Sequence, residues 1–117
     1  MNTRESGRTG EDIAADYLAA RGFEIIARNY SIKANFQGGE IDIIAKKKDR
    51  IHFIEVKVRN TGLFGLGREA VGFKKQRTIK MLATRWLQSK KLYNEIDVSF
   101  DIVEIDNGLV DFFENVF

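Results

Sequence analysis

The sequence predicts an α/β fold in which helices flank a central mixed sheet of five strands. Two segments place their apolar residues at helical spacing, and five shorter runs are rich in β-branched and aromatic residues and are bounded by turn residues. The predicted order is one helix, three strands, a second helix and two strands. Because 117 residues are enough for one core, we expect residues 1–117 to form a single domain with about the first eight residues flexible.

The first helix is predicted to begin after Thr9 and to end at Gly22. Thr9 is a suitable N-cap, and Asp12 occupies the acidic position of a capping box three residues later. The apolar residues that follow keep helical spacing, and glycine is common just past a helix end. Residues 23–29 are then expected to form the first strand, followed by a loop over residues 30–39.

Residues 40–45 and 51–59 are predicted to form an antiparallel hairpin. A basic turn over residues 47–50 connects the two strands and sets Lys46 beside Ile51. Both strands are apolar enough to be buried, so a charged residue within them carries a desolvation cost.

This register places Asp42 opposite Glu55 on one face of the hairpin. Glu40 and Lys57 share that face, each two residues along its own strand. Opposed like charges destabilise a strand pair, and one lysine cannot neutralise three carboxylates. We therefore predict a site for a hard divalent cation, with Mg²⁺ favoured where phosphates are substrates. The alternatives are a structural ion-pair cluster of Asp42, Glu55 and Lys57, and a surface position for Glu40.

Residues 69–89 are predicted to form a long amphipathic helix. Its buried stripe consists of Ile79, Leu82, Ala83 and Trp86, and its exposed arc carries Lys74, Arg77, Lys80 and Arg85. Lys75 lies on the apolar side near the helix start. It either reaches the acidic site or lays its aliphatic stem against the core.

The C-terminal part is predicted to be a second hairpin, of residues 96–105 and 109–113. The turn between them contains Asn107-Gly108, a strong signal for a two-residue hairpin loop. His52 faces away from the acidic residues, so we expect a packed histidine there and not a metal ligand.

Charge is distributed unevenly along the chain. Residues 46–91 hold 14 Lys or Arg against three acids, whereas residues 92–117 hold seven acids and no Lys or Arg. A basic middle segment beside an acidic site suits a polyanionic substrate such as nucleic acid. The alternative is that the two segments neutralise each other in the fold.

Composition excludes disulfides and thiolate metal sites, because the chain has no cysteine. The start of the chain lacks an apolar secretion signal, and no apolar stretch is long enough to span a membrane. We therefore expect a cytoplasmic protein without a membrane partner.

Glu-Ile-Asp at 40–42, Glu-Val-Lys at 55–57 and the helix that follows resemble the PD-(D/E)XK arrangement of nucleases. Five blocks in order resemble, more closely, the bacterial YraN family, also called UPF0102. They are Thr-Gly-Glu-Asp-Ile-Ala-Ala at 9–15, Arg-Asn at 28–29, Gly-Glu-Ile-Asp-Ile-Ile-Ala at 39–45, Phe-Ile-Glu-Val-Lys-Val-Arg at 53–59 and Glu-Ala-Val at 69–71. The resemblance spans nearly the whole chain.

The resemblance implies a restriction-endonuclease-like three-layer fold and a nuclease that uses Mg²⁺ or Mn²⁺ to hydrolyse phosphodiester bonds in nucleic acid. DNA is the favoured substrate, with branched DNA as one candidate, because the family is similar to archaeal Holliday junction resolvases. Carried onto this sequence, the catalytic residues are Glu11, Asp42, Glu55 and Lys57. The implied metal ligands are Asp42, Glu55 and the Val56 carbonyl, with Glu40 as a weaker candidate.

The expected phosphate contacts are Lys74, Lys75, Arg77 and Arg59. The alternative is a charged helix face that is only solvated, and for Glu11 a favourable interaction with the helix dipole. A second function compatible with the sequence is a nucleic-acid-binding protein that retains the fold with little or no turnover. A third is an interaction protein that uses the charge asymmetry, and a homodimer is compatible with the sequence.

Overall fold

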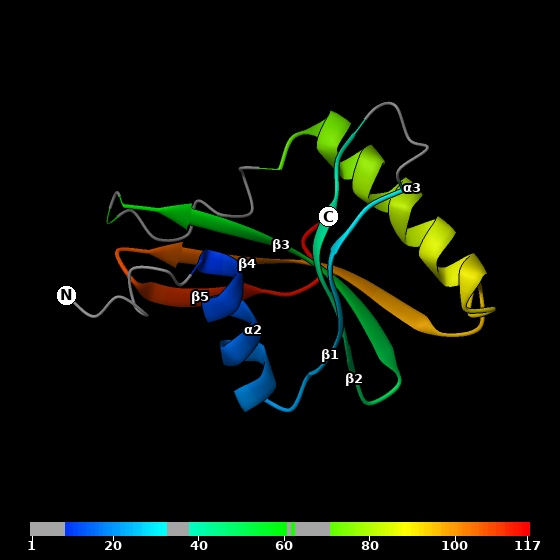
Figure 1. Ribbon diagram of the computed structural model, residues 1–117, viewed down its shortest axis with the longest axis horizontal. Coiled ribbons are helices and arrows are strands. Elements are labelled where there is room, and N and C mark those ends of the chain that lie inside the picture. The colour runs from blue at the N-terminus through cyan, green and yellow to red at the C-terminus, as the bar shows by residue number, and fades with distance from the viewer. Residues whose placement is uncertain (1–8, 33–37, 61, 63–70) are drawn as a thin grey trace.

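The computed structural model describes residues 9–32, 38–60, 62 and 71–117, so the first eight residues, for which we expected flexibility, lie outside it (Figure 1). Its elements are α2 (Gly10–Ala20), β1 (Glu24–Tyr30), β2 (Ile41–Lys47), β3 (Arg50–Arg59), α3 (Phe73–Ser89), β4 (Asp97–Asp106) and β5 (Leu109–Phe113). The strands form one sheet in the order β1-β2-β3-β4-β5. β3 and β4 pair in parallel, and the other neighbours are antiparallel. The predicted α/β class with a mixed five-stranded sheet is therefore confirmed.

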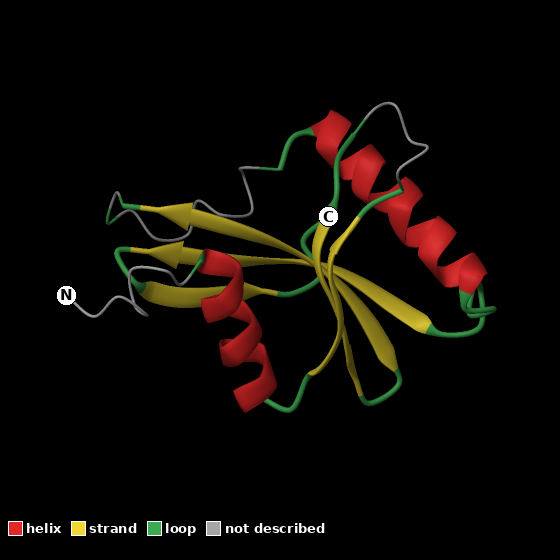
Figure 2. Cartoon of the chain, viewed as in Figure 1, coloured by secondary structure: helices red, strands yellow, loops and turns green. Residues whose placement is uncertain are grey.

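One helix covers each face of the sheet (Figure 1, Figure 2). On one face α2 buries Ala14 and Leu18 in a cluster with Ile54. On the other face α3 buries Leu82 in a cluster with Phe53. The neighbours Phe53 and Ile54 belong to different clusters because successive side chains of a strand point to opposite faces of the sheet. Full burial of a leucine contributes about 2 kcal/mol, so both helices are fixed by their apolar stripes. The result is the three-layer arrangement that the resemblance implied.

α2 begins with the predicted capping box. Thr9 Oγ1 accepts a hydrogen bond of 3.1 Å from the Asp12 N–H, and Asp12 Oδ2 accepts one of 3.1 Å from the Thr9 N–H. The helix ends at Ala20, and Gly22 follows with a left-handed φ of 90°, which glycine adopts without steric cost.

α3 begins at Phe73, so the predicted start at residue 69 is wrong. Gly72 is extended (φ −73°, ψ 168°) and serves as the N-cap, while Val71 before it is buried in the core. Residues 69 and 70 lie outside the described residues. The predicted buried stripe of Ile79, Leu82, Ala83 and Trp86 is confirmed. Neither described helix is long and apolar enough to cross a membrane.

Both predicted hairpins form, with strand ends that differ from the prediction by at most two residues. Lys46 pairs with Ile51 as predicted. Asn107 (φ 51°) and Gly108 (φ 80°) connect β4 to β5, with both residues left-handed as a type I′ turn requires. The parallel pairing of β3 with β4 needs a crossover, which α3 supplies. This crossover brings the first turn of α3 back over β3.

Candidate metal centre

The predicted site lies at a fork in the sheet, where β2 leaves β3 (Figure 1). Backbone pairing of β2 with β3 ends at Ile43 and Ile54, whereas β3 remains paired with β4 as far as Arg59. Asp42 and Glu55 are the next residues beyond the last pair. A carboxylate replaces the missing backbone partner, because Asp42 Oδ2 accepts a hydrogen bond of 2.8 Å from the Val56 N–H.

Two further acids reach the same place from outside the hairpin. Carboxylate oxygens of Glu11, in the first turn of α2, and of Glu40, just before β2, lie with one of Asp42 within 4.8 Å of one another. α2 can approach this closely because Gly10 lacks a side chain: a Cβ there would overlap Val58 at the end of β3. We call Glu11, Glu40, Asp42 and Glu55 the acidic fork.

Glu11 is positioned but incompletely bonded. Its Oε2 accepts a hydrogen bond of 2.8 Å from Asn29 Nδ2, and Arg28 Nη2 lies 3.8 Å from its Oε1. The Oε1 atom is buried and accepts no hydrogen bond within the described part of the chain. A buried carboxylate oxygen without a donor is costly, so Glu11 has an open position for a cation.

Asp42 shows the electrostatic strain of the fork most clearly. Burial raises the pKa of Asp42 to about 8, with further contributions from its hydrogen bond with the Glu55 carboxyl and from the negative charges of Glu55 and Glu11. The Val56 N–H opposes this increase but does not outweigh it. At neutral pH the fork therefore holds either a proton on Asp42 or a cation that replaces it.

Glu55 is neutralised from the other side. Its side chain is buried, its Oε2 forms an ion pair with Lys75 Nζ from α3, and Lys57 Nζ lies 3.8 Å from the same oxygen. Burial and the neighbouring Lys75 lower the pKa of Lys57. For Lys75 burial lowers the pKa, but the combined effects of its interaction with Glu55, of Lys57 and of the charge of Asp42 outweigh burial, so its pKa is raised. Of the two alternatives for Lys75, the structure shows the one in which it reaches the site.

The donor set fits a hard divalent cation. Carboxylate oxygens are the ligands that Mg²⁺ and Mn²⁺ prefer, and the unbonded Glu11 Oε1 is available for one more contact. Val56 also fits its predicted role. The N–H and C=O of one strand residue point to the same edge, and the Val56 N–H is directed to Asp42, so its carbonyl faces the fork as well.

The predicted phosphate contacts fall into two groups. Lys74 and Arg77 are exposed on α3, as a contact surface requires, and Lys75 is directed into the site. Arg59 is directed elsewhere: its Nε lies 3.2 Å from Oε2 of Glu104, which is fully buried on β4. Contact of these residues with nucleic acid stays a prediction.

Sequence reasoning gave no role to three residues beside the fork. Asn29 donates a hydrogen bond to Glu11, 18 residues before it in the sequence. Arg28 donates one to Asp12, 16 residues before it. The Arg28-Asn29 pair was noticed only as part of the family resemblance. Glu104 could have been found from alternation, because it shares a face with buried Ile102 on β4.

Relatives of this chain share most of its length. A model of the family described as "Uncharacterised protein family UPF0102" matches residues 10–105, which include the whole acidic fork and both lysines. A UPF0102 protein of Dictyoglomus turgidum is 44% identical over 105 residues, which cover 90% of this chain and 85% of the relative. A UPF0102 protein of Fusobacterium nucleatum is 42% identical over 116 residues, which cover 99% and 93%.

Proposed function

The chain belongs to the UPF0102 family, and from the geometry of its acidic fork we propose that it is a metal-dependent nuclease that hydrolyses phosphodiester bonds in nucleic acid, with DNA as the substrate. One observation carries the proposal. Glu11 comes from α2, Asp42 from β2 and Glu40 from the residue before β2, and their carboxylate oxygens lie within 4.8 Å of one another. Such an arrangement is costly without a cation, and a cation beside a basic surface suits phosphodiester chemistry.

In this proposal Asp42, Glu55 and the Val56 carbonyl hold Mg²⁺ or Mn²⁺, and Glu11 and Glu40 complete the site directly or through water. A bound cation of this kind polarises a phosphate group and lowers the pKa of a coordinated water. Asn29 keeps Glu11 turned toward the fork through its 2.8 Å hydrogen bond.

Lys57 and Lys75 supply positive charge at the phosphate. Lys57 is the more buried of the two, its pKa is lowered by burial and by Lys75, and it lies 3.8 Å from Glu55. A partly buried ammonium in this position orients the attacking water or offsets negative charge that develops on the phosphate. Lys75 neutralises Glu55 when no cation is bound, and a cation at Glu55 would free it to contact substrate.

The exposed cations of α3 provide a docking surface for the strand. Lys74 and Arg77 project into solvent on the helix whose first turn enters the site. Contacts of this kind with phosphates supply sequence-independent, salt-sensitive affinity. A cysteine-free chain is compatible with the cytoplasm, where bacterial DNA is found.

A second candidate is a nucleic-acid-binding protein with little or no turnover. It is favoured by the double neutralisation of Glu55, which already has Lys75 and Lys57 as counter-ions and therefore needs no cation itself. Pure binding, however, gives no reason to bring Glu11, Glu40 and Asp42 together beside phosphates.

The test is cleavage of labelled linear, single-stranded and four-way-junction DNA in Mg²⁺ or Mn²⁺. The wild type is compared with Lys57→Ala and with Lys90→Ala, which removes an exposed lysine beyond the end of α3. We expect cleavage by the wild type and Lys90→Ala, none with EDTA, and a large loss in Lys57→Ala. Equal cleavage by all three proteins would reject the site, and absence of cleavage with retained, salt-sensitive binding would favour the second candidate.

A further inference from the structure

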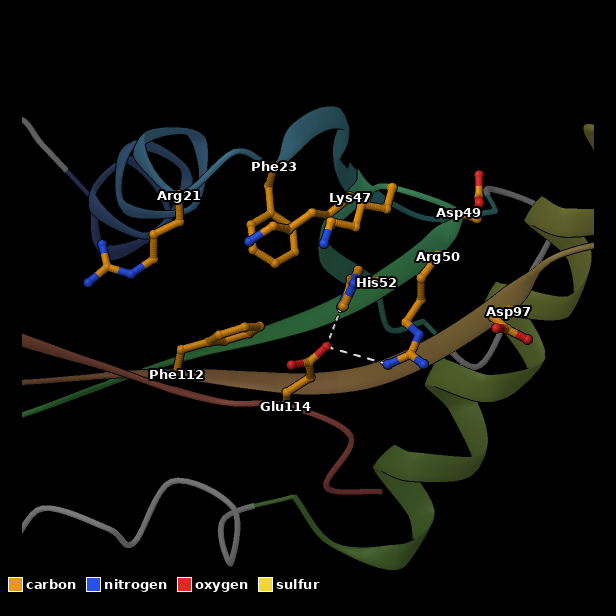
Figure 3. Close-up of a pocket in the computed structure, with 10 residues that line it drawn as sticks. Arg21, Phe23, Lys47, Asp49, Arg50, His52, Asp97, Phe112 and Glu114 are labelled. Atoms are coloured by element: carbon orange, nitrogen blue, oxygen red, sulfur yellow. Dashed lines mark ion pairs between the residues drawn. The ribbon is translucent and has the colours of Figure 1, made fainter.

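A cavity of about 600 Å³ lies away from the acidic fork, where the turn between β2 and β3 meets the end of α2 and the end of β5 (Figure 3). One part of its lining is aromatic and consists of Phe23, His52 and Phe112. The rings of Phe23 and Phe112 meet edge to face at 5.7 Å, and those of Phe23 and His52 at 4.9 Å. Phe23 and His52 are buried in this packing, and Phe112 is the partly exposed ring that can offer apolar surface to a flat ligand.

His52 is held rigidly at the cavity. Its ring is buried, and Nδ1 lies 2.6 Å from Oδ2 of Asp101, which is fully buried. Asp101 also accepts hydrogen bonds from the Ser99 hydroxyl and, at 2.8 Å, from the Asn115 N–H. A carboxylate with these partners acts as an acceptor, so Nδ1 of His52 carries the proton. For the other ring nitrogen, Nε2, no hydrogen bond to a described residue is found, and the side chain is 3% exposed at the edge of the cavity.

Charged groups surround these rings. Lys47 Nζ lies 5.1 Å from the ring centre of Phe23, and Arg21 and Lys48 contribute two more exposed cations. Figure 3 shows Glu114 between Arg50 and His52, with its Oε2 3.5 Å from Arg50 Nη1 and 3.8 Å from His52 Nδ1. Two further acids, Asp49 and Asp97, also line the cavity, which thus combines an aromatic ring, four Lys or Arg side chains and three carboxylates.

We propose that this cavity binds a nucleotide. The base would lie against the aromatic lining, a phosphate would face Lys47 and its neighbouring cations, and Glu114 and His52 Nε2 would meet hydrogen-bonding groups of the base or sugar. Base stacking on aromatic side chains and cation contacts to phosphate are the usual combination for unpaired nucleotides. This chemistry is shared by a free nucleotide and by an unpaired nucleotide of a strand.

The cavity and the acidic fork are separate sites. His52 precedes Glu55 by three residues on β3, so their side chains point to opposite faces of the sheet and their backbones are about 10 Å apart. The nucleotide proposal therefore does not rest on the proposed nuclease activity, and it is tested without a divalent cation.

The experiment titrates the full chain, in EDTA, with adenosine monophosphate, with inorganic phosphate and with a short single-stranded oligonucleotide, and follows amide chemical shifts by NMR. We expect the nucleotide to shift residues around His52 and Phe112 and phosphate alone to bind more weakly. We expect Lys47→Gln to weaken nucleotide binding about fivefold, and Phe112→Leu to weaken it about tenfold, as loss of a stacking ring does.

Lys90→Gln is the matched control, because Lys90 also lies over an aromatic ring, 5.9 Å from the centre of Trp86, but on α3. It should leave binding unchanged. If the oligonucleotide binds, adenosine monophosphate does not, and Lys47→Gln abolishes the oligonucleotide binding, the proposal is supported and the nucleotide belongs to a strand. Equal binding of phosphate and nucleotide, equal effects of Lys47→Gln and Lys90→Gln, or no shifts with either nucleotide probe would each overturn it.

Discussion

Two aspartates of the sheet, Asp101 and Asp42, have opposite surroundings. Asp101 on β4 is fully buried and has three partners: His52 Nδ1 at 2.6 Å, the Asn115 N–H at 2.8 Å and the Ser99 hydroxyl. Asp42 at the fork is partly buried and has one backbone donor and three acidic neighbours. Burial, its hydrogen bond with Glu55 and the charges of Glu55 and Glu11 raise its pKa to about 8. A buried carboxylate with donors at both oxygens fixes structure, whereas one crowded by other acids favours a proton or a cation.

The difference has a structural cause. Asp101 lies within a continuous strand pair, where Ile54 is its partner on β3 and the C-terminal residues after β5 fold back onto it. Asp42 lies one residue beyond the last pair between β2 and β3. Strand divergence leaves the Val56 N–H without a backbone acceptor, so it donates to Asp42, and it opens space for a ligand beside that carboxylate.

The largest effect is expected where the buried carboxylate is satisfied. Asp101→Ala leaves His52, the Ser99 hydroxyl and the Asn115 N–H without their acceptor, so it should lower the free energy of unfolding by about 3 to 5 kcal/mol. Urea unfolding followed by Trp86 fluorescence measures the change. Asp111→Ala on the exposed part of β5 is the control and should change stability by less than about 0.5 kcal/mol. A loss below about 1 kcal/mol for Asp101→Ala would show that the cluster is not structural.

At the fork the largest effect should fall on activity instead of stability. If the chain is a nuclease, Lys57→Ala should reduce the cleavage rate about 100- to 1,000-fold, because it removes a charge placed at the reacting phosphate. The free energy of unfolding should change by less than about 1 kcal/mol, since Lys57 is a partly buried amine whose charged form is disfavoured. Initial cleavage rates and urea unfolding of the same preparations provide both readouts. If Lys57→Ala lowers the free energy of unfolding as much as Asp101→Ala does, Lys57 has a structural role.

The two regions also differ in how well the sequence predicts them. Period-two alternation and the basic turn predict the register that pairs Lys46 with Ile51. The same register brings Asp42 next to Glu55 at the fork. The approach of Glu11 to Asp42 depends on how α2 docks on the sheet, which no local pattern encodes. The His52–Asp101 contact joins residues 49 apart through parallel strands, so the sequence predicted a packed histidine but not its partner. The predicted start of α3 at residue 69 is wrong, although Gly72 is a residue type that local preference favours at an N-cap.

Removing the charge of Asp42 should stabilise the cation-free protein. The pKa of Asp42 is about 8 in the folded chain, above the ordinary value of 3.8, so its ionisation opposes folding. The penalty is absent below pH 4, grows as the pH rises and is complete above pH 8. Because Asp42 is only partly buried, we expect Asp42→Asn to gain about 1 to 2 kcal/mol at pH 8 and little at pH 4. Urea unfolding in EDTA at pH 4 and pH 8 measures the two changes in stability. If Asp42→Asn loses stability at pH 8, the Asp42 carboxylate stabilises the fold, as that of Asp101 does.

The effect most specific to the fork is the pH dependence of cation affinity. A cation that binds ionised Asp42 displaces one proton below pH 8, so affinity for Mn²⁺ should rise about tenfold per pH unit from pH 6 to pH 8 and then level off. Calorimetry in buffers of different ionisation enthalpy would detect the released proton directly. Asp42→Asn should abolish both signals, whereas Asp111→Ala should retain them. If the affinity for Mn²⁺ does not change between pH 6 and pH 8, the cation does not bind ionised Asp42. The position of the Asp42 carboxylate at the fork would then not be explained by cation binding.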